Sequence, residues 1–271
     1  MNNKLKQVAM GAAKKAGREL LLRFKNFNRN KIQMKSAHEI LTKADLASEK
    51  IIIGEIRKNF PGHRILSEEA GVVKTKKSPL PPFVKGGKNN GYLWIIDPLD
   101  GTTNFSIHNP LWSISISLAY KNEIILGIIY APFLGELFAA RKGKGVTLNG
   151  KKIRVSKIKG AKALHTFCHG RGNKHIEKAL AYLSRQKLDG FDCRQLGSAA
   201  IELGFIAAGR TESIMIPGVN SWDVAAGALI VREAGGRVTD FAGEEWNLKS
   251  KDILASNGVV HKELLRVIGM F

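Results

Sequence analysis

The sequence predicts a mixed fold, with an α+β part over residues 1–158 followed by an α/β part over residues 159–271. Residues 112–120 alternate large apolar and small side chains, which is the two-residue period of a strand, and a continuous apolar run follows at 124–130. Beyond these, short apolar runs alternate with helical patterns, which indicates an α/β arrangement. The chain has 271 residues and no Gly/Ser linker, so we expect one compact unit.

The first half begins with two predicted helices. Apolar residues recur every three or four positions over residues 3–27, which predicts an amphipathic helix. A second helix is predicted over residues 45–60, where Pro61-Gly62 ends it. Ile65-Leu66 then predict a short strand that leads into Ser67-Glu68-Glu69.

Strands dominate the rest of the first half. Residues 92–96 are apolar and run into Asp97, after which Pro98 is expected to end the strand. Asn149-Gly150 lies between two strand-like runs and predicts a tight hairpin turn. Residues 74–91 are rich in proline, lysine and glycine and predict a surface loop.

The second half is predicted to alternate strands and helices. The predicted strands cover residues 163–168, 191–194, 212–216, 237–240 and 253–255. The predicted helices cover residues 174–186, 197–208, 222–234 and 260–269.

The chain is strongly basic, and its charge is unevenly spread. Lys and Arg number 43 against 23 Asp and Glu, a formal net charge of +20. Residues 1–35, 74–88 and 141–162 hold most of the excess, and the last two stretches contain no acid. These stretches indicate either a surface for polyanions or ordinary solvated faces and loops. A basic protein also attracts small phosphorylated molecules through long-range electrostatics.

The cysteines and the hydropathy pattern bear on the compartment. Cys168 and Cys193 are too few for a disulfide framework or a four-cysteine zinc site, so we expect both to stay reduced. No apolar run reaches the roughly 18 residues of a membrane-spanning helix. We therefore expect a soluble, cytoplasmic protein without membrane association.

The segment Trp94–Asn104, WIIDPLDGTTN, is the sharpest functional feature. Asp97 and Asp100 lie three residues apart where an apolar strand ends, followed by a turn with exposed backbone amides at Gly101 and Thr102. Converging carboxylates repel one another unless a cation lies between them, and oxygen ligands favour Mg²⁺ or Mn²⁺. The same residues also suit a plain Asx turn and helix cap, so the pattern alone leaves both interpretations open.

Other acids lie at the ends of predicted elements. Glu68-Glu69 follow a short strand, and Asp223 begins a helix rich in small apolar residues. Asp45 begins the helix at 45–60. Each of these acids taken alone suits a surface pair or a helix cap. Together they occupy the places where sites assemble in α/β proteins.

These segments resemble the inositol monophosphatase family of metal-dependent, lithium-sensitive phosphatases. The resemblance rests on WIIDPLDGTTN and on NSWDVAAGALIVREAGG at residues 220–236, with LSEEAG, LTKAD and QLGSAAIELGFIAAGR in the family's order. It reaches to about residue 258. It implies a layered α-β-α-β-α sandwich of the sugar-phosphatase type, a homodimer, and hydrolysis of a phosphate monoester by metal-activated water.

The resemblance implies a site for two or three Mg²⁺ ions, with Mn²⁺ as an alternative. Glu68, Asp97 and the backbone carbonyl of Leu99 would hold a first ion. Asp97, Asp100 and Asp223 would hold a second. Glu68 would also contribute to a weaker third site.

The resemblance also implies catalytic and substrate-binding residues. Thr102 and Asp45 would orient and deprotonate the attacking water, and Glu69 would assist through a neighbouring water. The amides of Gly101 and Thr102 would bind the phosphate. Gly197-Ser198-Ala199 match the segment beside the sugar ring.

Two basic residues have weaker assignments. Lys35 matches a lysine near the metal site, where it would anchor phosphate or tune a carboxylate, although a surface lysine fits equally. Arg171 suits a second anionic group of the substrate through its guanidinium fork, although a solvated loop arginine fits as well.

The predicted substrate is inositol 1-phosphate or a related small polyol or sugar phosphate. Inositol-selective relatives carry a glutamate seven residues before the second-motif aspartate, and Ile216 stands there in this chain. Fructose 1,6-bisphosphate, nucleotides and histidinol phosphate therefore remain alternatives. A different class of function, an RNA- or protein-binding regulatory scaffold that uses the basic surface, also remains open.

Overall fold

The computed structural model describes residues 2–29, 33–36, 39–73, 91–170 and 172–271. Its helices are α1 (Asn2–Lys25), α2 (Lys43–Asn59), α3 (Thr102–Ser106), the 3-10 helix η2 (Gly160–Lys162), α4 (Asn173–Leu188), α5 (Ala199–Ala207), α6 (Ser221–Glu233) and α7 (His261–Ile268). All six predicted helices are confirmed, each within a few residues at its ends. Of the helices in the described ranges, none has the length and apolarity needed to cross a bilayer.

The larger sheet comes from the first half of the chain. Its strand order is β10 (Lys151–Lys152), β9 (Val146–Leu148), β8 (Glu136–Arg141), β7 (Glu123–Ala131), β6 (Ser113–Tyr120), β5 (Tyr92–Asp100), β3 (Arg64–Ser67) and β4 (Gly71–Val73). All pairs are antiparallel except β3 with β5, which run parallel. The predicted hairpin is confirmed, since Asn149 and Gly150 join β9 to β10 with positive φ at both residues.

The smaller sheet comes from the second half. Its strand order is β12 (Asp192–Arg194), β11 (Leu164–Phe167), β13 (Ser213–Pro217), β15 (Asp252–Ser256) and β14 (Arg237–Thr239). Strand β11 is parallel to β12 and β13, whereas β15 is antiparallel to both its neighbours. The predicted alternation of strands and helices is confirmed. The sheet that they form contains both parallel and antiparallel pairs.

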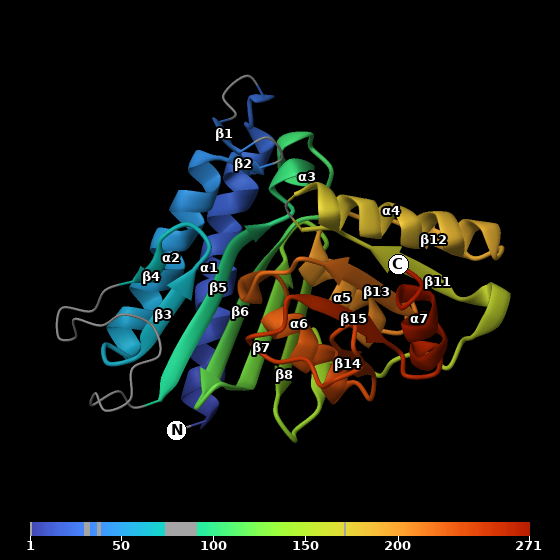
Figure 1. Ribbon diagram of the computed structural model, residues 1–271. Helices are drawn as coiled ribbons and strands as arrows, with labels where there is room; N and C mark the ends of the chain where they lie inside the picture. The colour runs from blue at the N-terminus through green and yellow to red at the C-terminus, as the bar shows by residue number, and fades with distance from the viewer. Residues whose placement is uncertain (1, 30–32, 37–38, 74–90, 171) are drawn as a thin grey trace.

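The elements stack in five layers (Figure 1). Helices α1 and α2 cover one face of the larger sheet, α5 and α6 lie between the two sheets, and α4 and α7 cover the outer face of the smaller one. The predicted layered α-β-α-β-α sandwich is confirmed. A two-stranded antiparallel sheet of β1 (Gln33–Ser36) and β2 (Glu39–Leu41) was not predicted. Residues 74–90, most of the predicted surface loop, lie outside the described ranges.

The alternation in β6 explains how the larger sheet packs on both faces. Ile114, Ile116 and Leu118 contribute to the cluster beneath α1 and α2. The intervening serines point to the other face, where Ser115 donates a hydrogen bond to the Trp222 carbonyl of α6 at 3.3 Å. Small side chains there allow the helix to approach closely.

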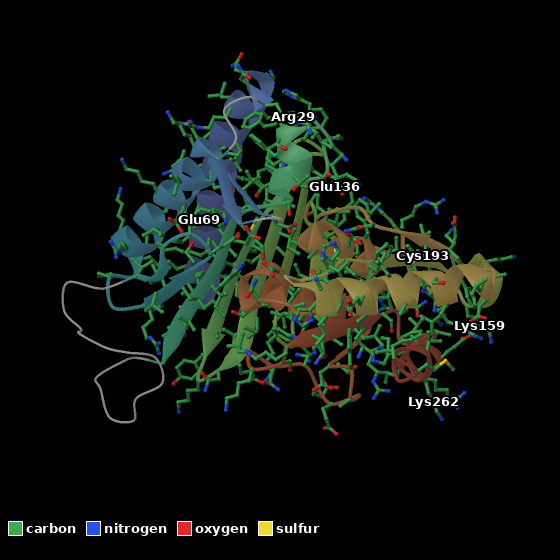
Figure 2. All side chains as sticks on the ribbon, turned by 45° about the horizontal axis from the view of Figure 1, so that its top comes forward. Arg29, Glu69, Glu136, Lys159, Cys193 and Lys262 are labelled. Atoms are coloured by element: carbon green, nitrogen blue, oxygen red, sulfur yellow. The ribbon has the colours of Figure 1, made fainter. Side chains whose placement is uncertain are left out.

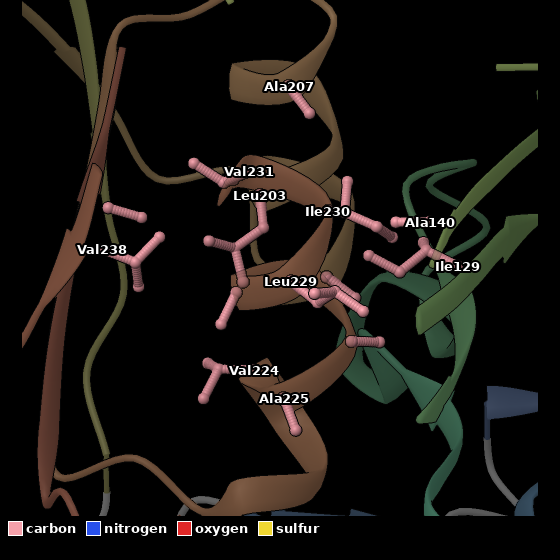
Figure 3. Packing of buried hydrophobic residues seen from close by; sticks show 14 of the residues in the cluster. Ile129, Ala140, Leu203, Ala207, Val224, Ala225, Leu229, Ile230, Val231 and Val238 are labelled. Atoms are coloured by element: carbon pink, nitrogen blue, oxygen red, sulfur yellow. The ribbon is translucent and has the colours of Figure 1, made fainter. Parts of the chain in front are cut away.

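The central hydrophobic cluster joins the two halves of the chain (Figure 3). Leu229 and Val231 of α6 lie between Ile129 of the larger sheet and Val238 of the smaller one. A Cβ atom on Gly127 would lie 2.6 Å from the Ala226 carbonyl oxygen, so β7 and α6 require a glycine there. We propose that the two parts of the chain fold as one unit through this shared cluster, which predicts a single calorimetric unfolding transition.

The expectation that Pro98 ends the strand is wrong. Strand β5 continues to Asp100, and its register with β6 shifts between Asp97, opposite Ser115, and Asp100, opposite Ser113. Pro98 lies in this irregular step, where a residue without an N–H group does not interrupt the ladder. The irregularity therefore places both aspartates near one end of a central strand.

Candidate active site

A cavity of about 380 Å³ opens where β5, β11 and β13 end. Its lining includes Glu68, Asp100, Gly197, Ala199, Ile216 and Asp223, all of them residues singled out in the sequence. The volume lies in the range of roughly 300–1,000 Å³ that small-molecule sites occupy. The cavity is therefore the candidate active site.

Asp97 and Asp100 are held in fixed orientations at the end of β5. Asp97 is buried, and its Oδ1 accepts a hydrogen bond from the Leu99 amide at 3.0 Å. Asp100 Oδ2 accepts hydrogen bonds from Ala200 N and Ser113 Oγ, both at 3.1 Å, and from Ser198 Oγ. Asp100 thus ties the larger sheet to the beginning of α5.

Glu68 and Glu69 follow β3, the parallel neighbour of β5. The Glu68 amide donates to the Ile96 carbonyl at 3.1 Å, which extends the β3–β5 ladder and sets Glu68 beside the strand that carries Asp97. Glu68 lines the cavity. Glu69, which Figure 2 labels, is half-buried next along the chain.

Asp223 comes from the other half of the chain, in the first turn of α6. Its Oδ2 accepts a hydrogen bond from the Asn220 amide at 3.0 Å, so the carboxylate also caps the helix. The sequence left a cap and a site residue as alternatives. The structure gives Asp223 both a capping bond and a place in the cavity wall.

The acids in this region form one electrostatic neighbourhood. Burial raises the pKa of Asp97 well above its usual range, and the charges of Glu68, Asp100 and Asp223 raise it further. Burial raises the pKa of Asp223 to about 8, with Glu68 contributing. Burial raises the pKa of Asp100 to about 6, against the lowering effect of its hydrogen bonds from Ser198, Ala200 and Ser113.

The donor set suits a hard divalent cation. Carboxylate oxygens are the ligands that Mg²⁺ and Mn²⁺ prefer, and a cation among them relieves their mutual repulsion. Within the described ranges, no group of three or more Asp, Glu, His or Cys side chains is arranged so that it could hold a metal ion. The fit to such an ion therefore rests on the chemistry of these carboxylates, and the individual ligand roles are proposals.

Asp45 and Thr102 form a hydrogen-bonded pair across 57 residues of sequence. Thr102 Oγ1 lies 3.1 Å from Asp45 Oδ1 and 2.9 Å from the Leu99 carbonyl oxygen. Asp45 Oδ2 accepts hydrogen bonds from the Thr42 amide and hydroxyl, at 2.8 and 2.6 Å. Asp45 is thus a cap residue of α2 whose second oxygen meets Thr102.

Two glycine turns lie against each other beside these acids. Gly101 has φ 84°, and a Cβ atom there would lie 2.9 Å from the Leu111 carbonyl and 3.2 Å from the Gly197 carbonyl. Gly197 has φ 80° and begins the turn that leads through Ser198 into α5. Both turns require glycine because of their backbone conformation and their close approach.

The remaining predicted site residues are placed as follows. Ala199 and Ile216 both line the cavity, and Ile216 is buried in β13. Lys35 belongs to β1, but its side chain lies outside the described part of the structure, as does Arg171 entirely.

Sequence reasoning missed Glu202. This fully buried residue of α5 accepts hydrogen bonds at Oε1 from Gly197 N at 3.1 Å, Leu196 N at 3.3 Å and Cys168 Sγ at 3.2 Å. Burial raises its pKa to about 7. A signal was available, because Glu202 is the single charged residue between Arg194 and Arg210 in an apolar helix.

The layered fold and the acid-lined cavity together define a protein of the sugar-phosphatase type of architecture. The chain belongs to the inositol monophosphatase family, whose sequence profile it matches over residues 1–269. The resemblance inferred from the motifs is thereby confirmed.

The relatives carry two kinds of name. The chain is 36% identical over 268 residues to the Nus factor SuhB of Pasteurella multocida, covering 98% of this chain and 96% of the relative. It is 38% identical over 230 residues to the fructose-1,6-bisphosphatase/inositol-1-monophosphatase of Thermotoga maritima, covering 85% and 82%. The structure of extragenic suppressor protein suhB from Bartonella henselae matches with a TM-score of 0.87 at 32% identity, covering 98% of both chains.

Proposed function

We propose that the protein is a Mg²⁺-dependent phosphomonoester hydrolase acting on inositol 1-phosphate or a related small polyol or sugar phosphate. The main support is the group of carboxylates formed by Glu68, Asp97, Asp100 and Asp223, in which the other three charges raise the pKa of Asp97. This group lies beside the hydrogen-bonded pair Asp45–Thr102. Family membership and a relative named as a phosphatase support the same proposal.

The ligand roles follow from the position of each acid. Glu68, Asp97 and the Leu99 carbonyl would hold a first ion. Asp97, Asp100 and Asp223 would hold a second, and Glu68 would share a third. Bound divalent ions supply charge neutralisation for the ester and lower the pKa of a coordinated water.

The protein's own residues would position the nucleophile. Thr102 Oγ1 would orient the attacking water, and Asp45 would accept a proton through Thr102, because its Oδ1 lies 3.1 Å from that hydroxyl. The two hydrogen bonds from Thr42 hold Asp45 so that its Oδ1 faces Thr102. Glu69, one residue beyond Glu68, would assist through a second water.

The substrate would lie along the two glycine turns. The amides of Gly101 and Thr102 would bind the phosphate, and the segment Gly197-Ser198-Ala199 would face the ring. Ile216 and Val219 make part of the cavity wall apolar. Fructose 1,6-bisphosphate, histidinol phosphate and nucleotides stay alternatives, because this wall lacks the inositol-binding glutamate. Lys35 and Arg171 would contribute positive charge to substrate binding.

The direct test is phosphate release from a panel of esters, with Mg²⁺ and with a chelator. The panel contains inositol 1-phosphate, fructose 1,6-bisphosphate, histidinol phosphate, NADP and 3′-phosphoadenosine 5′-phosphate. We expect turnover of at least one ester with Mg²⁺ and none with chelator. Equal turnover under both conditions, or no turnover of any ester with Mg²⁺ bound, would contradict the proposal.

Three finer properties accompany this proposal. We expect inhibition by Li⁺, a homodimer in solution and a cytoplasmic location. A steady-state assay with LiCl and sedimentation analysis test the first two. Fractionation of the source cells tests the third.

A second candidate function, an RNA- or protein-binding regulatory scaffold, is favoured by the basic surface. Seven exposed cations between residues 144 and 162 form no ion pair with any acid in the described ranges: Lys144, Lys151, Lys152, Arg154, Lys157, Lys159 and Lys162. Figure 2 shows Lys159 and Lys262 at the outer margin of the molecule. Relatives named Nus factor SuhB agree with such a role.

RNA binding tests this second candidate. The affinity of the wild-type chain should fall steeply with salt, because each neutralised phosphate releases counterions. A triple variant with Lys151, Lys152 and Lys157 changed to Gln should bind more weakly and with a shallower salt dependence. Unchanged affinity of the triple variant would remove this surface from consideration.

A further inference from the structure

A second cleft, of about 310 Å³, lies at the end of the larger sheet opposite the acidic cavity. Tyr92 begins β5 and lines this cleft, whereas Asp97 lies five residues further along the same strand, roughly 16 Å away at about 3.3 Å per residue. The N-terminus of α1 lies beside this end of the sheet in Figure 1, and Leu5 forms part of the wall. The cleft is therefore separate from the candidate active site.

A row of four aromatic rings leads to the cleft. The rings of Tyr92 and Tyr120, opposite each other on β5 and β6, have centroids 4.7 Å apart. His63 stacks on Tyr92 at 4.5 Å, and Phe60 stacks on His63 at 4.8 Å. The row ends at Tyr120, whose side chain is exposed. It offers the flat π surface that planar bases stack on.

Cations surround this aromatic row. Lys121 Nζ lies 5.5 Å from the centroid of the Tyr120 ring. Arg141 and Lys142 line the cleft itself, and Lys142 forms an ion pair with Glu123. Arg141 Nη1 donates a hydrogen bond to the neutral Asn3 Oδ1 at 3.1 Å, and neither Lys121 nor Arg141 forms an ion pair with an acid in the described part of the chain. Their positive charges are therefore not neutralised by a described acid.

The turn that follows Arg141 is held firmly. Glu233 of α6 accepts hydrogen bonds from the amides of Gly143 and Gly145, both at 2.7 Å, and of Lys144, at 3.1 Å. The Lys142 amide donates to the Ile125 carbonyl at 3.1 Å. This part of the cleft wall is therefore pre-formed, which lowers the entropic cost of binding.

We propose that this cleft binds a nucleotide unit, with the base on the exposed ring of Tyr120, which Tyr92 supports from behind, and the phosphate on Arg141 and Lys121. An aromatic platform favours a planar base, and a guanidinium fork favours a phosphate group. The same chemistry is offered by a free mononucleotide and by one unit of a single-stranded RNA. The proposal is independent of the hydrolase activity and of the basic surface at residues 144–162.

The test uses two probes, AMP and a fluorescein-labelled single-stranded RNA of about ten nucleotides, a length typical of such sites. Binding is measured in chelator with the full-length chain, and again with Asp97→Asn, so that binding of phosphate at the metal site does not contribute. We expect both forms to bind the RNA equally.

Two variants and two matched controls locate the binding. Tyr120→Leu and Arg141→Gln should each weaken RNA binding about tenfold, and Arg141→Gln should reduce the slope of log affinity against log salt by about 1. Phe133→Leu and Arg185→Gln remove an exposed aromatic ring and an exposed arginine elsewhere and should change nothing. Thermal unfolding of each variant shows that it is folded. Arg141→Lys keeps the charge but loses the guanidinium fork, so its affinity should lie between those of the wild type and Arg141→Gln.

The two probes distinguish the sources. Displacement of RNA by AMP shows that a mononucleotide suffices, whereas RNA binding that AMP does not displace assigns the cleft to a strand. Absence of binding by both probes overturns the proposal. Wild-type affinity in both Tyr120→Leu and Arg141→Gln also overturns it, as does a loss that occurs only in the Lys151, Lys152 and Lys157 variant.

Discussion

Thr102 Oγ1 lies 3.1 Å from Asp45 Oδ1, although Asp45 belongs to α2 and Thr102 begins α3, 57 residues later. Asp45 is also the third residue of α2, where its carboxylate completes the capping box with the N-cap residue Thr42, so the start of that helix fixes the position of the carboxylate. Burial raises the pKa of Asp45, while hydrogen bonds from Thr42 and Thr102 act in the opposite direction. A carboxylate held in this way suits a proton acceptor.

Asp45→Asn is therefore expected to reduce kcat by about 100-fold or more, which is the usual contribution of a general base. The affinity for Mg²⁺ should change little, because Asp45 is not among the proposed ligands. Asp189→Asn, which removes an exposed acid paired with Arg185, is the matched control and should behave as wild type. Steady-state kinetics decide the matter, and a wild-type kcat in Asp45→Asn would exclude the proposed role.

The metal-free protein is expected to lose stability as the pH rises from 5 to 8. Asp100 and Asp223 have folded-state pKa values of about 6 and about 8, above the ordinary value of 3.8. Between pH 3.8 and about 6 for Asp100, and between pH 3.8 and about 8 for Asp223, the folded chain holds a proton that the unfolded chain has released. The free energy of unfolding therefore falls with rising pH, by about 1.4 kcal/mol per pH unit for each such proton.

Chemical denaturation in chelator at several pH values measures this slope. Asp223→Asn should flatten it, since the amide carries no titrating proton. Saturating Mg²⁺ should restore stability most strongly at pH 8, where the carboxylates are ionised and bind best. A metal-free stability that rises from pH 5 to pH 8 would be inconsistent with these pKa values.

Glu202 is expected to position the turn that orients Asp100. Its Oε1 holds the Gly197 amide, and Ser198 of the same turn donates to Asp100. Glu202→Ala should raise the Mg²⁺ concentration needed for half-maximal activity several-fold and destabilise the fold by about 1–3 kcal/mol. Glu202→Gln keeps an acceptor oxygen and should restore most of the Mg²⁺ response.

Glu212 provides a control of matched burial. It also is a buried glutamate that accepts a backbone hydrogen bond, from Leu164 N at 2.6 Å, but its partners Leu164 and Ser156 lie outside the turn that contacts Asp100. Glu212→Ala should lower stability without altering the Mg²⁺ requirement. If Glu202→Ala and Glu212→Ala change the stability of the fold and the Mg²⁺ requirement to the same extent, Glu202 has a purely structural role.

Ile216 is expected to limit the use of inositol 1-phosphate. It lies in the cavity wall at the position where the resemblance implies a hydroxyl-binding glutamate. Ile216→Glu should raise kcat/KM for inositol 1-phosphate about tenfold relative to the other esters, the effect of a hydrogen bond to a charged group. Ile216→Val keeps the wall apolar and should leave the order of substrates unchanged. If Ile216→Glu leaves the order of kcat/KM values among the esters unchanged, Ile216 does not determine substrate specificity.

Local patterns predicted most elements, because each had a clear period or boundary. The Ile/Ser alternation of β6 and the Asn149-Gly150 turn are examples. Strands β1 and β2 were missed, since short strands depend on pairing rather than on their own pattern. Pro98 was misjudged because the sequence does not show that the register of β5 shifts there.

The candidate site divides in a similar way. Asp97, Asp100 and Asp223 stand in recognisable motifs at element ends, and the structure brings Asp100 and Asp223 into one cavity wall. Glu202 was missed because its partners, Gly197 and Cys168, are contacts made by folding. The aromatic row of Phe60, His63, Tyr92 and Tyr120 comes from three separate segments, so no local pattern indicates it.

We propose that the carboxylates around Asp97 form a divalent-metal site that hydrolysis requires. Isothermal titration with Mg²⁺ near pH 7, in two buffers of different ionisation enthalpy, tests this proposal. We expect the wild-type chain and the exposed-site control Asp192→Asn to bind Mg²⁺ and release protons, and Asp97→Asn not to bind. Binding of Mg²⁺ by Asp97→Asn with wild-type affinity and proton release would contradict this proposal.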